Sequence, residues 1–315
     1  MESLQNIKAR RNAVKNIGQI TKAMEVVSAT KMRKSQEVAL RSRVYGFAAL
    51  SILRELLLHT PGNILASAPF VAGRAVRTTL LVVMVSDRGL AGAFNSQLMR
   101  AADAFLAKDI HAQTAGHTYK LALVGKKAFS YGAKKGLEIV GSFEGFGDYV
   151  TPLESKPIAD LISEGYTDGR WDRVVVVSTH FRTTLRQEPL VRELLPLHID
   201  TIHDTIAELV PEHGRFAELR AKVEEEPPLS QEEYIFEPSP ERLIAVLMPH
   251  LVSMQLYQLL LEANASEHSA RRVAMKSASD NASELGEGLL LLFNKARQAG
   301  ITKEMTEISS AIVNQ

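Results

Sequence analysis

No proline occurs before Pro61, and Gly18 and Gly46 are the only glycines before it. Apolar residues recur at intervals close to three and four along the first half of this stretch, which is typical of a helix. We therefore expect one continuous helix over 1–58, of about 50 residues and roughly 75 Å at 1.5 Å per residue. A helix of this length cannot bury all of itself in a small domain, so it needs a partner helix or an enclosing sleeve.

Part of this helix, ITKAMEVVSATKMRKSQ (20–36), combines apolar residues with four basic ones. Between Met1 and Arg43 there are ten lysines and arginines against three acids, although the net charge of the chain is only +1. The basic surface is therefore local, and nucleic acid, a membrane surface or an acidic protein could be its partner. A leucine-zipper DNA-binding protein has its basic block directly ahead of the leucine repeat in the same helix, which is not the case here. A membrane-binding face favours Trp, Phe or Leu, whereas this one has Ile, Val and Met.

The chain has no cysteine, which excludes disulfides, thiolate zinc ligands and thiol catalysis. No uninterrupted apolar run reaches the roughly 18 residues of a transmembrane helix. The first residues are basic and amphipathic like a transit peptide, but their helical pattern continues without a break. We therefore expect a structural helix there instead of a cleaved targeting segment.

Apolar runs alternate with helical patterns in the middle of the chain. We expect strands at 78–86, 119–125, 137–143 and 172–181, an edge strand at 191–199, and helices at 89–108, 126–135 and 159–166. Pro196 suits an edge strand better than a central one. This alternation predicts an α/β foot domain at 76–200 with a mostly parallel, Rossmann-like sheet.

The last part of the chain is again helical. After an acidic connector (201–238), Ser239 can cap a helix with Pro240 in its first turn, and we expect that helix over 239–315. Pro249 should kink it or mark its effective start. Steps of three and four form a coiled-coil seam through Met275, Ala278, Ala282, Leu285, Leu289, Leu292, Ala296 and Ala299. The economical arrangement is an antiparallel coiled coil of the N- and C-terminal helices.

No motif predicts an active site. SDRGLAGAFN (86–95) lies between a strand and a helix but lacks a phosphate-binding glycine pattern, and we expect Gly89 and Gly92 to permit a tight turn. HIDTIHD (198–204) lacks a zinc-binding spacing. His180, His250 and His268 stand alone and are expected to be structural. We therefore expect no catalytic, cofactor-binding or metal-binding residues, with a nucleotide-binding enzyme as a minor alternative.

Several stretches resemble the gamma subunit of F-type, proton-translocating ATP synthases: ITKAMEVVSATKMRKSQ, SDRGLAGAFN, YIFEPSPERL, SEHSARRVAMKSASDNASEL and NKARQAGITKEMTEI. Together they span almost the whole chain. The resemblance implies a non-catalytic central rotor shaft. Its two helices turn inside a ring of alpha and beta subunits, and its α/β domain meets the epsilon subunit and the membrane-embedded c-ring. No nucleic acid, no cofactor and no insertion into the membrane are implied.

The resemblance also assigns contact residues. Met24 corresponds to a methionine that faces an acidic lever segment of the beta subunit, with Lys22, Lys31, Arg33 and Lys34 attracting acidic loops. Arg297 and Gln298 correspond to a pair that touches a beta-subunit catch loop. Further contacts are implied for Thr302 and Glu304 near that loop, and for Tyr234 and Glu237 at the epsilon subunit and the c-ring.

Two departures from the family pattern stand out. Ala91 occupies a position where many relatives have cysteine, and the connector is longer than in the simplest bacterial members. Without cysteine, thiol regulation through the connector is excluded. We expect a peripheral protein at the cytoplasmic face of a bacterial inner membrane, and a non-motor coiled-coil adaptor is the main alternative.

Overall fold

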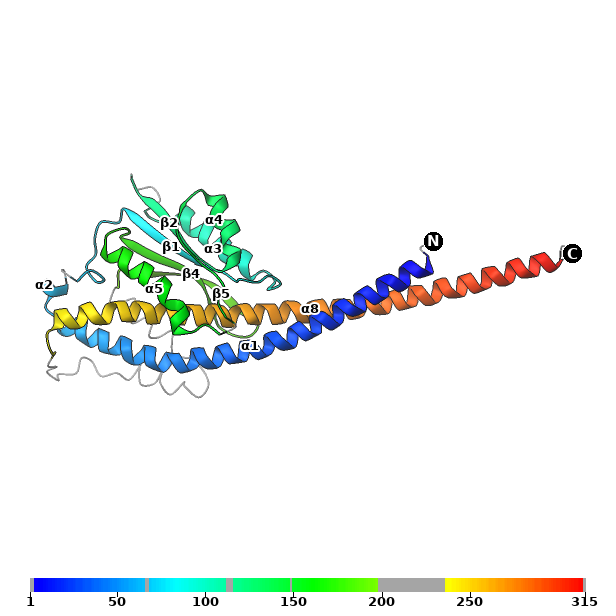
Figure 1. Cartoon of the computed structure of the whole chain (residues 1–315), viewed down its shortest axis with the longest axis horizontal. Helices are drawn as coiled ribbons and strands as arrows, with labels where there is room; N and C mark the ends of the chain where they lie inside the picture. The colour runs from blue at the N-terminus through cyan, green and yellow to red at the C-terminus, as the bar shows by residue number, and fades with distance from the viewer. Residues whose placement is uncertain (1–2, 66–67, 112–115, 148, 198–235, 314–315) are drawn as a thin grey trace. The chain divides into compact units, whose positions relative to one another are not determined.

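The computed structural model describes residues 3–65, 68–111, 116–147, 149–197 and 236–313 (Figure 1). The chain divides into two compact units. The first, which we call the helical pair, consists of Met1–Thr30 and Arg271–Gln315. The second, the sheet unit, spans Lys31–Ala270.

Two long helices contribute to both units. Helix α1 runs from Leu4 to His59, and helix α8 runs from Pro240 to Val313. The side-chain oxygen of Ser239 accepts a hydrogen bond from the Arg242 N–H at 3.4 Å, so the expected cap is present. Pro249 lies inside α8, so the expectation that it could mark the start of the helix is wrong. The cap and Pro240 already fix the start, and Pro249 removes only one hydrogen-bond donor from a long helix.

The sheet unit contains a five-stranded sheet of order β3-β2-β1-β4-β5. The strands are β1 (Thr78–Met84), β2 (Thr118–Val124), β3 (Glu138–Phe143), β4 (Arg173–Phe181) and β5 (Gln187–Leu195). The first four are parallel, and β5 is antiparallel to β4 at the edge. The predicted mostly parallel sheet with an edge strand is confirmed.

The last strand differs in its bounds from the sequence expectation. It begins at Gln187 instead of 191 and ends at Leu195, before Pro196. A tight turn explains the early start, because Thr183 and Arg186 exchange backbone hydrogen bonds of 3.0 and 3.2 Å and bring the chain straight back along β4. The polar residues Gln187 and Glu188 at the start of β5 concealed it in the sequence.

Helices cover both faces of the sheet (Figure 1). One face packs against α3 (Phe94–Lys108) and α4 (Phe129–Lys135), which follows the short 3-10 helix η1 (Lys126–Ala128). The other face packs against α5 (Pro152–Thr167) and the parts of α1 and α8 that belong to the sheet unit. A short helix, α2 (Gly62–Leu65), follows α1.

Helix α5 begins seven residues earlier than the expected 159. Thr151 and Glu154 form a capping box, in which each side chain bonds the other residue's backbone N–H, and Pro152 occupies the first turn. These local signals determine the start of the helix. The polar first turn carries little of the apolar periodicity from which the helix was predicted.

The apolar face of α8 completes the core on one side of the sheet. Met248, Leu251, Val252, Leu256 and Leu259 are buried there together with strand residues. An 18-residue window of α8 has a mean hydropathy of 1.5, apolar and long enough to cross a membrane by length and composition, and half of that window is buried in the protein. Packing against the sheet accounts for this apolar character, as in the core helix of a globular domain.

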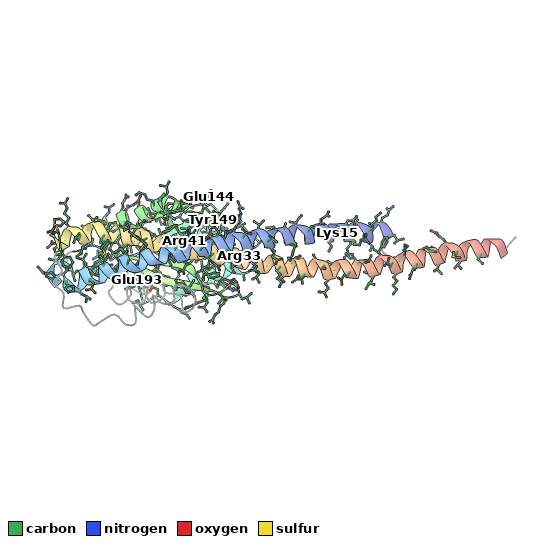
Figure 2. All side chains as sticks on the ribbon, turned by 90° about the horizontal axis from the view of Figure 1, so that it is seen from below. Lys15, Arg33, Arg41, Glu144, Tyr149 and Glu193 are labelled. Atoms are coloured by element: carbon green, nitrogen blue, oxygen red, sulfur yellow. The ribbon has the colours of Figure 1, made fainter. Side chains whose placement is uncertain are left out.

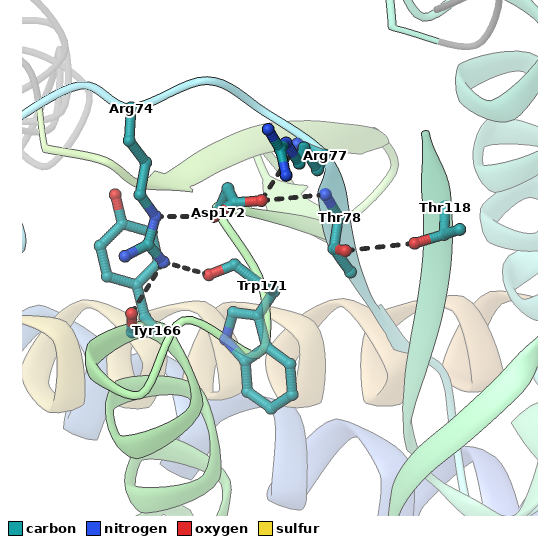
Figure 3. Close-up of polar contacts among 7 residues, drawn as sticks. All are labelled: Arg74, Arg77, Thr78, Thr118, Tyr166, Trp171 and Asp172. Atoms are coloured by element: carbon teal, nitrogen blue, oxygen red, sulfur yellow. Dashed lines mark hydrogen bonds and ion pairs between the residues drawn. The ribbon is translucent and has the colours of Figure 1, made fainter. Parts of the chain in front are cut away.

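Polar contacts tie the loop before β1 to the turn between α5 and β4 (Figure 3). The Arg74 guanidinium lies 4.4 Å from the centre of the Tyr166 ring and forms a 2.8 Å ion pair with Asp172. Asp172 in turn accepts the backbone N–H groups of Arg77 and Thr78 at 3.0 and 3.1 Å. These bonds set where β1 enters the sheet.

Gly165 permits this corner to close. A Cβ atom at position 165 would lie 1.9 Å from the ring of Trp171, which is fully buried. We predict that Gly165→Ala lowers the free energy of unfolding by about 1–3 kcal/mol, because the indole must move within a dense core. Urea unfolding followed by Trp171 fluorescence measures this effect.

Gly73→Ala is the matched control, because a Cβ atom there meets nothing within 4 Å. Equal stability of the two variants would contradict the packing at this corner.

Candidate functional site

The helical pair is antiparallel. A Cβ atom on Gly18 would lie 3.4 Å from Ala282, and one on Gly286 would lie 4.0 Å from a methyl group of Val14. Further toward the chain ends, the Arg11 guanidinium lies 5.5 Å from the centre of the Phe293 ring. As position numbers on α1 fall, those on α8 rise, so the two helices run in opposite directions (Figure 1).

The seam of this pair differs in part from the expected one. Met275 and Leu289 are buried as predicted, and Ala278, Ala282 and Ala296 are half-buried. The expectation is wrong for Leu285, Leu292 and Ala299, which are exposed. Their neighbours Gly286 and Phe293 face α1 in place of the two leucines. A glycine permits close approach of the helices, and the phenylalanine ring receives a cation. The predicted seam of methionine, alanine and leucine at steps of three and four included neither residue.

The buried seam residue Thr21 is satisfied within its own helix. The Thr21 hydroxyl donates to the carbonyl oxygens of Ile17 and Gly18 at 3.0 and 3.1 Å, although Thr21 is 9% exposed. Close packing of small groups holds the seam at Gly18 and Gly286.

Large apolar side chains also lie on the outside of the pair. Ile20 is 60% exposed and Leu291 is 71% exposed. The others among the described residues of the pair are Leu4, Ile17, Val26, Val27, Val273, Leu285, Leu290, Leu292, Ile301 and Met305. Exposed apolar surface on this scale favours contact with another protein. The surface is thus equipped to be enclosed by another protein.

The residues predicted on α1 to contact the beta subunit fall in both units. In the helical pair, Met24 is half-buried and Lys22 forms a 2.9 Å ion pair with Glu25. In the sheet unit, Lys31 is half-buried and Arg33 is exposed on the same stretch of α1 as Arg41 (Figure 2). Their proposed contacts with the beta subunit stay a prediction.

The residues predicted on α8 are all exposed: Arg297, Gln298, Thr302 and Glu304. The Thr302 hydroxyl donates to the Gln298 carbonyl oxygen at 2.9 Å, so it is engaged within the helix. Gly286 on α8 lies opposite Val14 on α1, and α1 begins ten residues before Val14. The start of α1 therefore lies opposite α8 near position 296. Beyond that level, no residue of α1 in the described part of the chain accompanies α8 (Figure 1).

The structure does not bring the two groups of predicted residues together. Met24 follows Val14 by ten residues, so in the antiparallel pair it lies near Lys276, ten residues before Gly286. Arg297 is about 21 residues further along, which is roughly 30 Å at 1.5 Å per residue. The predicted contact residues on the two helices therefore fall in two separate regions.

At the start of α8, sequence reasoning missed an apolar groove. Glu237 is exposed, whereas Tyr234 lies outside the described residues. Close to Glu237 in the chain, a hollow of about 470 Å³ is lined by Ile52, Leu56, Phe236, Leu243, Val246, Leu247 and His250. Val246 is 70% exposed and stands on the helix face opposite the core. That second apolar stripe on α8 was the signal in the sequence.

A family model described as ATP synthase matches residues 3–313. The ATP synthase gamma chain of Roseiflexus castenholzii is 38% identical, over 98% of this chain and 97% of that one. The gamma chain of an Anaeromyxobacter species is 36% identical, over 98% of both chains. The chain belongs to the ATP synthase gamma-chain family.

Solved structures agree with this membership. A chain of the central stalk and c-ring structure of Tetrahymena thermophila mitochondrial ATP synthase is 25% identical, with a TM-score of 0.56 over 82% of this chain and 99% of that one. A chain of the Euglena gracilis mitochondrial ATP synthase, in a structure of OSCP, F1 and c-ring, shares the fold. Its TM-score is 0.62 at 17% identity, over 98% of this chain and 93% of that one.

In this family member the SDRGLAGAFN motif builds a closed loop. Asn95 accepts the Ser86 N–H at 3.0 Å, and the Ser86 hydroxyl donates to the Arg88 carbonyl oxygen at 2.6 Å. Gly92 has a positive φ of 57°, as expected of the tight turn. The expectation is wrong for Gly89, because Leu90 adopts the second left-handed conformation, with φ 63°. The hydrogen bonds on either side hold Leu90 in a conformation that costs about 1–2 kcal/mol.

The carboxyl edge of the sheet, where α/β proteins bind ligands, is occupied by Asp87. Its carboxylate accepts the N–H groups of Lys126, Gly145 and Phe146 at 2.8, 3.0 and 3.0 Å. These three donors are therefore not available to a phosphate, which the negative charge would also repel. HIDTIHD lies outside the described residues, and among the described ones no group of three metal-ligating side chains forms a metal site.

All three histidines that stand alone in the sequence were expected to be structural, and two of them, His180 and His268, are buried. His180 on β4 contacts Glu262 on α8 through a 2.7 Å hydrogen bond, and both side chains are buried. His250 contacts the Tyr45 hydroxyl. His268 is buried in α8.

Close packing of the helical pair leads to a test at Gly18. A leucine there would meet Ala282, so Gly18→Leu must push the helices apart. We predict that it lowers the free energy of unfolding of the pair by about 1–3 kcal/mol. Thermal unfolding followed by helical circular dichroism measures the change.

Gly288→Leu provides the control, since a Cβ atom there meets nothing within 4 Å. Because leucine is the better helix former, this control should be neutral or stabilising by up to about 1 kcal/mol. If the Gly18→Leu and Gly288→Leu chains unfold at the same temperature, the seam does not lie at Gly18.

Proposed function

We propose that the chain is the central rotor shaft of an F-type ATP synthase. It couples proton flow through the membrane ring to the conformational cycle of the catalytic sites on the beta subunits, in ATP synthesis or hydrolysis. The observation that carries this proposal is the helical pair itself. It has a packed seam and, in addition, a large apolar exterior that its own two helices cannot cover.

The physical properties of the pair suit a shaft. A proton that crosses the membrane releases roughly 2.3 kcal/mol per 100 mV, so several crossings must accumulate before one ATP is released. Energy can accumulate only in a stiff element. Close packing of the two helices at Gly18 and Gly286 supports such stiffness. An apolar exterior can turn inside an apolar sleeve without breaking many specific bonds, and polar contacts at a few angles then set resting positions.

We further propose that the chain is a non-catalytic subunit. The carboxyl edge of its sheet is closed by Asp87, and none of the contacts described above assembles a nucleophile with a base. The catalytic work then falls to the beta subunits of the head. The chain binds no nucleic acid and needs no cofactor in this proposal.

Two regions would meet the beta subunit. Around Met24, the basic residues Lys22, Lys31 and Arg33 would face the acidic lever segment, with attraction screened beyond about 8–10 Å. Arg297, Gln298, Thr302 and Glu304 would meet the catch loop, and their position on the stretch of α8 not accompanied by α1 leaves them open to a surrounding partner. The roughly 30 Å between the regions requires two different segments of the head.

A further set of contacts would lie in the sheet unit. We propose that Tyr234, Glu237 and the apolar groove beside Phe236 and Val246 meet the epsilon subunit and the c-ring. The protein would then be peripheral, held at the cytoplasmic face of a bacterial inner membrane by the ring and not by insertion of α8, whose apolar face is occupied by the sheet.

Substitutions in the two beta-subunit regions distinguish a rotor from a coiled-coil adaptor. We predict that Met24→Lys and Arg297→Ala each lower ATP-driven proton pumping by the assembled complex on the order of fivefold, without altering the thermal stability of the chain. Acidification of inverted membrane vesicles measures pumping. Lys156→Ala on α5 is an exposed control that should pump normally. Normal pumping by Met24→Lys and Arg297→Ala would favour the adaptor.

A further inference from the structure

The sheet holds α8 by polar bonds near the end of the sheet unit. The β4–β5 hairpin meets α8 at three successive levels. The Ser178 hydroxyl donates to the Leu259 carbonyl oxygen at 3.4 Å, His180 bonds to Glu262 at 2.7 Å, and the Ser269 hydroxyl donates to the Thr184 carbonyl oxygen at 2.6 Å. Steps of three and seven residues place these positions on one face of the helix.

Helix α1 is joined to the same network. The Ser42 hydroxyl donates to the Gln258 side-chain oxygen at 2.5 Å, and the Gln258 amide donates to Glu262 at 3.3 Å. One bonded series, which we call the polar chain, thus runs from His180 on β4 through Glu262 and Gln258 on α8 to Ser42 on α1. It links the sheet to both long helices.

Packing alone does not hold the polar chain in place. A cavity of about 320 Å³ lies beside it, and all four residues of the chain line that cavity. Dense interiors fix side chains by contact on every side, which a neighbouring cavity removes. Hydrogen bonds therefore determine the orientation of Glu262 and Gln258.

Stability does not explain why these buried residues are polar. His180, Gln258 and Glu262 are at most 8% exposed, and a buried ionic or polar pair stabilises a fold no better than well-packed apolar residues of similar size. Its best-supported role is to select one register. An apolar interface between helix and sheet permits small rotations about the helix axis, because apolar contacts have no preferred direction. Directional bonds oppose such rotations.

We propose that the polar chain locks α1 and α8 at one rotational setting against the β4–β5 hairpin, so that torque applied to the sheet reaches both helices without slip. His180, Glu262 and Gln258 are then positioning residues for coupling. This inference rests on the proposed rotor function. It adds the site within the chain at which torque passes from the α/β fold to the shaft.

The test compares His180→Phe, Glu262→Leu and the double variant in the assembled complex. Each single variant leaves one partner of the His180–Glu262 bond buried without the other and should lower the thermal stability of the complex. The double variant removes both partners of that bond and should recover part of the lost stability. Coupling should not recover. We expect all three to pump fewer protons per ATP hydrolysed in inverted vesicles, by about twofold or more. All three should also continue hydrolysis against a proton gradient that stalls the unmodified enzyme.

Recovery of coupling together with stability in the double variant would overturn the proposal, because the polar chain would then be only structural. If the double variant does not assemble, Gln258→Met breaks the chain at one link with similar volume. If that variant stops hydrolysing ATP at the same proton gradient as the unmodified enzyme, the proposal is overturned as well. Arg41→Ala, which breaks an exposed ion pair on α1, is the control and should stall normally.

Failure of the two proposals is distinguishable. If the complex with the unmodified chain pumps no protons on ATP hydrolysis, the rotor function itself fails. If that complex pumps and stalls normally and the double variant does the same, only the role of the polar chain fails.

Discussion

Two helices share only one seam, and each has more apolar surface than one seam can bury. In the helical pair, Gly18, Gly286 and small residues near them bring the helices close, but Ile20 and Leu291 remain outside. Exposed apolar surface of this extent is unfavourable in water. It is stable in a complex whose other subunits surround the pair, and the membership of the gamma-chain family identifies such a complex.

The sheet unit, in contrast, buries much of its apolar surface within itself. It has its own core on both faces of the sheet, to which α1 and α8 contribute their sheet-unit segments. Its loops are closed by internal bonds, as at Asp87 and at the Arg74–Asp172 corner. If the sheet unit transmits force, its loops must hold their positions. The polar chain holds α1 and α8 in position against the sheet in the same way. In this account, the apolar contacts supply stability and the hydrogen bonds supply angular position.

The sequence predicted what depends on periodicity and missed what depends on single contacts. Long runs without proline predicted α1 and α8, and alternating apolar runs predicted the parallel strands. The start of α5 depends on a capping box, and that of β5 on a turn, so both were placed too late. The seam was displaced at Leu285 and Leu292 because a glycine and an aromatic ring face α1 there. The bond between His180 and Glu262 joins positions 82 residues apart, and no local pattern indicates it.

The central claim, that this chain turns inside the head, has a direct test. The chain has no cysteine, so Leu185→Cys in the exposed β4–β5 turn creates a unique attachment point for an optical probe. With the head fixed to a surface and ATP supplied, the account predicts unidirectional stepwise rotation of the probe, with one step for each beta subunit in a full turn. A probe that stays still while the same complexes hydrolyse ATP would contradict the account.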